Sequence, residues 1–301
     1  MNFLLPSDHR LRSGWRFALG VLVFFLAEYL GGAAGSFVPG DHPLIVEAVG
    51  RSLNLALLLA GFAVLLISVD GVEHHPLACM GLAVRGAPWK RQAACGIVLG
   101  FAMIAVCALA IAIGGHLEFT VQLGAHNLLR ALVGLFVLAV AAMAEEAAFR
   151  GYPFQRLVEG LRPAGATLLT AIFFGALHAG NPNVSRIAVL NTALVGAVLA
   201  IAYLRTRSLW LPWGIHFGWN SALGVAFGLP LSGLRLFAIV VRGHATGPEW
   251  LTGGSYGVEA SLVGMLVIVA GGGVVWWMGG RQTLQSPAPE SPCHEITADG
   301  I

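Results

Sequence analysis

The sequence predicts an all-α polytopic membrane protein, a bundle of about eight transmembrane helices. Of its 301 residues, 57% are hydrophobic and only 11% are charged, and the mean hydropathy is +0.78. A soluble domain carries about 25% charged residues, so the class of soluble globular proteins is excluded. Disordered and nucleic-acid-binding chains need still more charge. We therefore expect the lipid bilayer, and no nucleic acid, as a partner.

Eight apolar runs are long enough to cross a bilayer. They lie near 15–35, 48–69, 92–114, 127–146, 164–180, 187–203, 209–228 and 258–279. A spanning segment must satisfy its own backbone hydrogen bonds, which predicts helices, and the alternating pattern of a membrane barrel is not seen. The first run has no small-residue cleavage site after it, so it is predicted to be a span and not a cleaved signal peptide.

The basic residues alternate regularly between the two sides of this bundle. Twelve of the 17 lie on one side, namely Arg10, Arg12, Arg16, Arg85, Lys90, Arg91, Arg150, Arg156, Arg162, Arg205, Arg207 and Arg281. The other five are Arg51, Arg130, Arg186, Arg235 and Arg242. This bias predicts that both termini are cytoplasmic. In a bacterial cell the multi-pass protein would then lie in the plasma (inner) membrane.

Two segments are predicted not to span. Residues 230–257 form a long outer connection, and its apolar stretch 234–241 is too short to cross, which suggests an interfacial or re-entrant position. Residues 281–301 are rich in proline, serine and acidic residues, which predicts a disordered tail. Residues 1–280 are accordingly predicted to form one transmembrane domain.

Few ionisable residues fall inside the predicted spans. Each costs at least ~2.5 kcal/mol on insertion scales, which makes it a functional candidate. The candidates are Glu28, Glu145, Glu146, His178 and His216, with Asn54, Asn191 and Asn220 as uncharged polar companions.

The two adjacent glutamates are predicted to differ in role. Glu146 and Arg150 are four residues apart, so they lie on one helical face and can pair. Glu145 is rotated by about 100° from Glu146 and has no partner at that spacing. The simpler alternative is a helix that ends at the cytoplasmic interface with ordinary solvated charges.

The two histidines sit in different sequence contexts. His178 is followed by glycine, asparagine and proline, which predicts the end of a helix, and a capping role is the simpler alternative. His216 and Asn220 share a face inside the seventh span. Two polar groups there need a polar partner, because lipid offers none. An interhelical hydrogen bond that only stabilises the bundle is the alternative.

Together these residues have the parts that amide hydrolysis needs. A free carboxylate and an imidazole that share one water form a general base, here Glu145 with His178. A second imidazole and a carboxamide, here His216 and Asn220, are hydrogen-bond donors suited to a developing oxyanion.

Three motifs carry a resemblance to a known family. They are Glu145-Glu146-x-x-x-Arg150, Phe174-x-x-x-His178 and His216-x-x-x-Asn220, in this order on successive predicted helices between about 129 and 222. The chain resembles the CAAX protease and bacteriocin-processing family (CPBP) of intramembrane proteases, to which the Ras-converting enzyme belongs. The resemblance implies an eight-helix bundle and an endopeptidase. It also implies that Glu146 and Arg150 support the site.

The resemblance further implies roles for the other site residues. Glu145 and His178 would activate the attacking water, and His216 and Asn220 would form the oxyanion hole. The family is often labelled as metalloproteases, and zinc usually takes three protein ligands. Glu145, His178 and His216 could supply these ligands or work without metal, and metal-free catalysis is slightly favoured. The substrate would be a membrane-associated polypeptide.

Two functions from other classes remain open. Buried Glu and His side chains suit a proton-coupled secondary transporter, and Glu28 would fit a proton relay, although the internal repeats typical of transporters are not seen. A non-catalytic membrane scaffold is the second alternative.

One expectation conflicts with the proposed chemistry. The predicted topology places Glu145 near the cytoplasmic end of the fourth span, and His178 about 20 Å deeper at the ideal rise of a helix. The two could share a water only if the helix of the first motif continues further, to about Tyr152.

Overall fold

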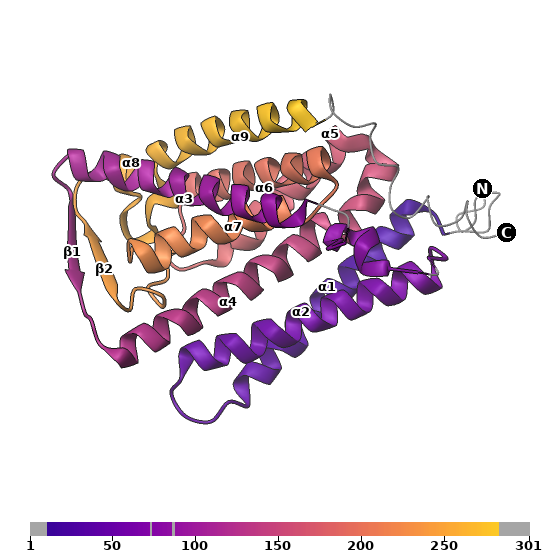
Figure 1. The fold of residues 1–301 in the computed structure, drawn as a ribbon, viewed down its shortest axis with the longest axis horizontal. Coiled ribbons are helices and arrows are strands. Elements are labelled where there is room, and N and C mark those ends of the chain that lie inside the picture. Colours follow the sequence, from indigo (N-terminus) through magenta and orange to yellow (C-terminus); the bar gives the residue numbers. More distant parts are fainter. Residues whose placement is uncertain (1–10, 73, 86–87, 283–301) are drawn as a thin grey trace.

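A computed structural model describes residues 11–72, 74–85 and 88–282, so nearly all of the predicted tail 281–301 lies outside the described residues. Each of the eight predicted spans has a helix in the structure (Figure 1). These helices are α1 (Ser13–Ser36), α2 (Pro43–Ser68), α3 (Trp89–Ile113), α4 (Ala125–Arg150), α5 (Tyr152–Leu177), α6 (Arg186–Thr206), α7 (Trp210–Ser221) and α9 (Leu262–Gln282). A four-residue helix, α8 (Glu249–Thr252), precedes α9.

The chain is an integral multi-pass membrane protein. Five helical segments of the described residues are long and apolar enough to cross a membrane, and one of these, Ala125–Gly180, joins α4 and α5. Two of the predicted spans fall short of this length. Helix α7 has 12 residues before a π-helical turn at Ala222–Ala226, and the apolar part of α9 is Leu262–Met278.

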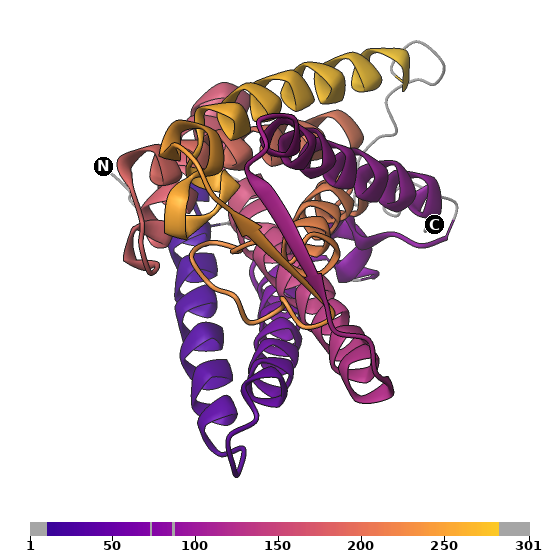
Figure 2. The ribbon, with the colours of Figure 1, turned by 90° about the vertical axis from the view of Figure 1, so that its left-hand side faces the viewer.

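The prediction of an all-α fold was wrong in one detail. Strands β1 (Leu117–Val121) and β2 (Val241–Ala245) pair as an antiparallel ribbon. Figure 2 looks onto the end of the bundle where this ribbon and the outer connection lie across the helices. The apolar stretch 234–241 forms no helix and leads into β2. Its side chains Phe237 and Ile239 are buried in the main core, which accounts for its hydrophobicity.

Helix α7 packs unusually closely on α3. A β-carbon at Gly100 would overlap the backbone oxygen of Ile215, and one at Gly218 would overlap that of Ile97. Small residues allow such close approach of helices in membranes. The glycines on either side of His216 therefore hold α7 against α3 and leave the opposite face of α7 for the polar residues.

Helix α5 is broken near its middle, and this break determines the depth of the site. Arg162 has a positive φ of 61° and is followed by Pro163, a combination that ends one helical leg and begins another. The chain reversal between the fourth and fifth predicted spans therefore lies at Arg162 and not just after Arg150. Arg150 itself is fully buried within α4, so its predicted place in a cytoplasmic connection was wrong.

The first leg of α5 continues the course of α4 along α1. Successive contacts join Phe149 to Phe24, Pro153 to Gly20, Glu159 to Arg16 and Gly160 to Ser13. Both distances are measured from near the chain reversal, at a rise of about 1.5 Å per residue. The chain covers about 21 Å from Glu159 back to Glu145, and about 24 Å from Arg162 forward to His178. The two residues thus reach similar depths, and the predicted depth conflict disappears.

Candidate active site

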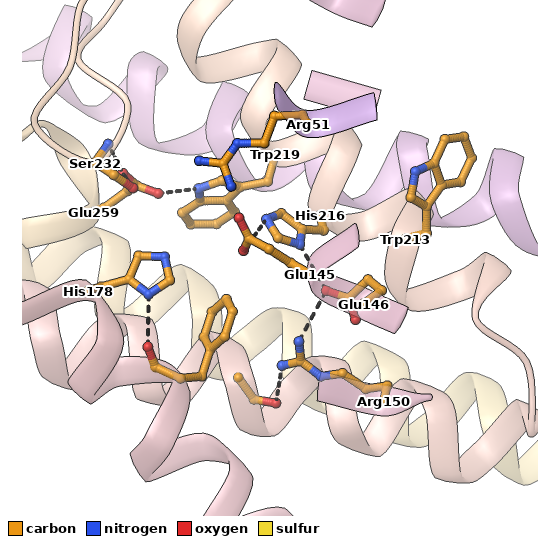
Figure 3. A network of polar contacts seen from close by, with 12 residues as sticks. Arg51, Glu145, Glu146, Arg150, His178, Trp213, His216, Trp219, Ser232 and Glu259 are labelled. Atoms are coloured by element: carbon orange, nitrogen blue, oxygen red, sulfur yellow. Dashed lines mark hydrogen bonds and ion pairs between the residues drawn. The ribbon is translucent and has the colours of Figure 1, made fainter. Parts of the chain in front are cut away.

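Three helices bring the predicted site residues together in the interior of the bundle (Figure 3). Glu145 and Glu146 lie one turn before the end of α4, and His216 and Asn220 lie on α7. His178 follows the last residue of α5 and begins a short 3-10 turn, His178–Gly180. This turn confirms the helix end that the sequence predicts there.

Glu146 is the central acceptor of a fully buried network. Its Oε1 accepts hydrogen bonds from Arg150 Nη1 at 3.1 Å and from His216 Nδ1 at 2.8 Å. The side chains of Glu146 and Arg150 are both 0% exposed. The predicted pairing of Glu146 with Arg150 is confirmed. Glu146 is also the polar partner that His216 was expected to need.

Arg150 is held by groups from three helices. Its second terminal nitrogen donates to the backbone oxygen of Gly196 at 2.9 Å, and its guanidinium lies 4.9 Å from the ring centroid of Phe174 and 5.6 Å from that of Phe149. A buried charge is tolerated when it is paired and hydrogen-bonded. Arg150 therefore joins α4, α5 and α6 behind the site.

Glu145 has a different environment from its neighbour. Its side chain is 25% exposed, and its Oε2 lies 3.8 Å from His216 Nε2, which is too long for a hydrogen bond. Both ring nitrogens of His216 thus face carboxylates, Glu146 on one side and Glu145 on the other. Two carboxylates favour the doubly protonated imidazolium, which is a donor on both sides.

The imidazole of His178 is oriented by the backbone of its own helix. Its Nδ1 lies 2.8 Å from the carbonyl oxygen of Phe174. A carbonyl can only accept, so Nδ1 carries the proton and Nε2 keeps a lone pair in the neutral ring. The Phe174 ring contacts both histidines, with centroids 4.7 Å from His178 and 6.3 Å from His216.

Glu145, His178 and His216 therefore lie near one another but are not all in contact. Within residues 11–72, 74–85 and 88–282, no hydrogen bond or ion pair joins His178 to Glu145 or His216, although His178 and Glu145 interact electrostatically. Asn220 is half-buried, and its side chain makes no hydrogen bond to the described residues. Its carboxamide is thus available to a ligand.

The predicted zinc ligands do not form a metal site in this arrangement. No group of three or more His, Cys, Asp or Glu side chains in the described part of the chain is placed to hold a metal ion. Glu145 and His216 face each other, whereas Phe174 lies between His216 and His178. Zinc sites need their ligands at about 2.0–2.3 Å from one point, so the three residues do not fit that group as placed.

The comparison with known families covers this same part of the molecule. Residues 127–222 match the family described as type II CAAX prenyl endopeptidase Rce1-like. Over this segment the chain is similar to the Rce1-like endopeptidases. The matched segment holds all three motifs, from α4 to the end of α7, and is about a third of the chain. No curated protein and no solved structure gives a significant match.

Two charged groups from outside the Rce1-like segment also face the site. Arg51 extends from α2 toward Glu145 (Figure 3) and is held by Glu47 at 3.2 Å and Glu28 at 3.7 Å. Asn54 donates to Glu28 at 3.0 Å. Arg51 lies in α2, within the second predicted span, 48–69.

Glu259 is the second such group. It lies in a short turn before α9, and its carboxylate contacts Trp219 of α7. Glu259 lies at the start of the eighth predicted span, 258–279, but it matches no spacing motif, so it was missed as a candidate. Only the return of the outer connection onto α7 brings it to the site.

An apolar cavity of about 260 Å³ adjoins the Rce1-like motifs. Its walls come from α1, α4 and both legs of α5, and include Phe24, Ala148, Phe149, Thr170 and Phe173. Ala148 and Phe149 come two and three residues after Glu146, and Phe173 precedes the phenylalanine of the second motif. The cavity therefore lies between α1 and the parts of α4 and α5 that carry the first two motifs.

Proposed function

We propose that this intramembrane protease cleaves a peptide bond of a membrane-associated polypeptide with Glu145 and His178 as the water-activating pair. The observation that carries this assignment is the unequal use of the two adjacent glutamates. Glu146 is completely buried and bonded to Arg150 and His216, whereas Glu145 keeps a partly exposed carboxylate. Only Glu145 is placed to meet water and a substrate.

The proposed reaction begins with a water between the Glu145 carboxylate and Nε2 of His178. As the water oxygen attacks the scissile carbonyl carbon, its proton passes to this pair, which acts as general base. The carbonyl oxygen gains a negative charge. When the tetrahedral intermediate collapses, the carbon–nitrogen bond breaks and the same proton is delivered to the leaving amine.

The negative oxygen is stabilised from the side of α7. Nε2–H of His216 and the amide N–H of Asn220 are its proposed donors, and their i, i+4 spacing places them on one face. Glu146 fixes the ring of His216 through Nδ1, so this donor is oriented before the reaction starts. Such preorganised donors act on the charge that develops in the transition state.

Cleavage of a membrane peptide by the purified protein tests the proposal. Wild type is expected to cleave, and Glu145→Gln is expected to be inactive but folded. Glu28→Gln is the matched control, because it removes a half-exposed carboxylate from a neighbouring helix and should leave cleavage within a few-fold of wild type. A chelator in the same assay tests for metal dependence. A wild type that cleaves nothing but moves protons or solutes into liposomes would favour the transporter.

The family description names prenylated substrates, and the apolar cavity beside α4 and α5 is suited to an apolar substituent. We include such a substituent in the proposal. Peptides of one sequence with and without a farnesyl group should then differ in KM, the modified one having the lower value. Equal KM values would remove the prenyl group from the proposal and leave the peptidase assignment intact.

A further inference from the structure

Glu259 is fixed in place by three hydrogen bonds to its carboxylate. Its Oε1 accepts from the indole N–H of Trp219 at 3.1 Å. Its Oε2 accepts from the backbone N–H of Ser232 at 2.6 Å and from the Ser232 hydroxyl at 3.1 Å. All three partners are donors, which is the pattern that an ionised carboxylate requires.

The turn that carries Glu259 is also anchored to the bundle. The side-chain amide of Asn191, a buried residue of α6, donates to the backbone oxygens of Glu259 at 2.8 Å and Ser261 at 2.9 Å. These two bonds explain why Asn191, a polar residue, lies inside the sixth predicted span. The backbone and the carboxylate of Glu259 are thus both held, and its position is set by α6 and α7 together.

The carboxylate contacts the helix that carries the proposed oxyanion donors. Trp219 immediately precedes Asn220 and lies three residues after His216. The bond from its indole therefore joins the outer connection to this one turn of α7. Any movement of Glu259 would be transmitted to the turn that presents both donors.

Glu259 also faces the imidazole of His178 (Figure 3). Burial raises the pKa of the Glu259 carboxyl, while the bonds from Ser232 and Trp219 and the charge of His178 act in the opposite direction. A carboxylate in a poorly solvated site interacts strongly with a nearby positive charge. In the proposed reaction His178 shares in taking up a proton, so its positive charge develops opposite Glu259.

We infer that Glu259 is a positioning residue for the proposed reaction, which orients the oxyanion turn through Trp219 and stabilises the positive charge that develops on His178. This inference rests on the proposed function. The charge interaction is made only once His178 is protonated, so its loss should lower kcat and leave KM nearly unchanged. A purely structural role would instead lower thermal stability and leave the turnover of the folded protein unchanged.

The test compares E259Q with the matched control E249Q in full-length purified protein. Glu249 is an exposed glutamate of the same outer connection, so E249Q removes the same charge away from the site. We expect E259Q to lower kcat by about 10- to 100-fold, a part of the 10²–10⁴ that proton-transfer groups contribute, with KM within about twofold. E249Q should match wild type. Wild-type kcat in folded E259Q would overturn the inference.

Two further variants separate the charge from the hydrogen bonds. W219F and S232A each remove one donor and keep the carboxylate, so each should retain more activity than E259Q. In protein labelled with 5-fluorotryptophan, W219F identifies the Trp219 resonance, and E259Q should shift that resonance while E249Q does not. If E259Q does not fold, the double variant W219F/S232A decides, because it removes the side-chain bonds that fix the carboxylate: a lower kcat at unchanged KM in folded protein supports the positioning role, and wild-type kcat contradicts it.

A failure of this inference can be distinguished from a failure of the peptidase assignment. If wild type cleaves and Glu145→Gln does not, the proposed function stands whatever E259Q does. If wild type does not cleave any peptide, both proposals fail together, and the fluorine shift would then report only a structural contact.

Discussion

Two clusters in this molecule each contain a Glu–Arg ion pair with i, i+4 spacing on one helix, but the pairs differ in burial and in their other partners. In α4, Glu146 and Arg150 are spaced i, i+4 and are both 0% exposed. In α2, Glu47 and Arg51 have the same spacing, and their side chains are 39% and 35% exposed. The first pair has buried partners on three other helices, whereas the second adds only Glu28 of α1.

The difference shows that spacing alone does not determine how much an ion pair contributes to the stability of the fold. Two buried charges lose their hydration, and breaking such a pair leaves one of them without compensation. Half-exposed charges keep water or lipid headgroups as alternative partners, so each of them is replaceable. We therefore expect substitutions in the α4 cluster to lower the free energy of unfolding. Substitutions in the α2 cluster should mainly change the electrostatic potential at Glu145.

The largest effect is expected for Glu146→Gln. It leaves Arg150 buried without its paired counter-charge and leaves His216 only a neutral acceptor, at a cost of about 3–5 kcal/mol. The midpoint of thermal unfolding and the yield from membranes measure this loss. Glu47→Gln, the same change at the same spacing, should cost less than about 1 kcal/mol. Equal losses in the two variants would contradict the comparison.

Asn220→Ala should have the next largest effect, on catalysis and not on stability. Removal of one oxyanion donor lowers kcat by about 10²- to 10³-fold, and KM should stay nearly constant because the substrate carbonyl is not yet charged. Steady-state kinetics and a melting curve on one preparation separate this from an interhelical bond. A fully active, folded Asn220→Ala would end the oxyanion assignment.

Gly218→Ala is expected to show that α7 depends on close packing for its position. The added methyl group would overlap the backbone oxygen of Ile97, and overpacking of this kind costs about 1–3 kcal/mol. Gly273→Ala is a suitable control, because a β-carbon there meets no atom within 4 Å. Unchanged melting of Gly218→Ala would show that α3 and α7 can separate without cost.

The smallest effect is expected for Arg51→Gln. Its salt bridges are half-exposed, so the free energy of unfolding should change by less than about 1 kcal/mol. Loss of the positive charge near Glu145 should change kcat by no more than about tenfold, and the change should diminish in high salt, which screens exposed charges. A loss as large as that of Glu146→Gln would place Arg51 with the buried cluster.

The sequence predicted most helices and most of the site because both depend on local signals. Apolar runs mark the spans within a few residues, and the i, i+4 spacing of Glu146 and Arg150 correctly indicates their pairing. The orientation of the bundle and the catalytic roles of the site residues stay predictions. The ribbon of β1 and β2 was missed, because each strand has five residues and they lie more than a hundred residues apart.

The depth of the site could not be predicted for a related reason. A charged segment after an apolar run, such as Arg150 to Arg162, is normally taken as a connection outside the membrane. Here the charges are neutralised inside the protein, Arg150 by Glu146 and Arg156 by Asp70 at 3.0 Å. The second pair joins residues far apart in the chain, which no local pattern predicts. Glu259 was missed for the same reason.

The depth of Glu145 in the bundle also determines how many substrate residues must enter before the proposed cut. Glu145 interacts electrostatically with Glu28, which lies eight residues before the end of α1, or about 12 Å at the rise of a helix. An extended strand covers that length with about four residues. A polypeptide that enters from that end of α1 would therefore be cut about four extended residues past the end of the helix, and moving a helix-breaking residue along the substrate should move the cut only within that window.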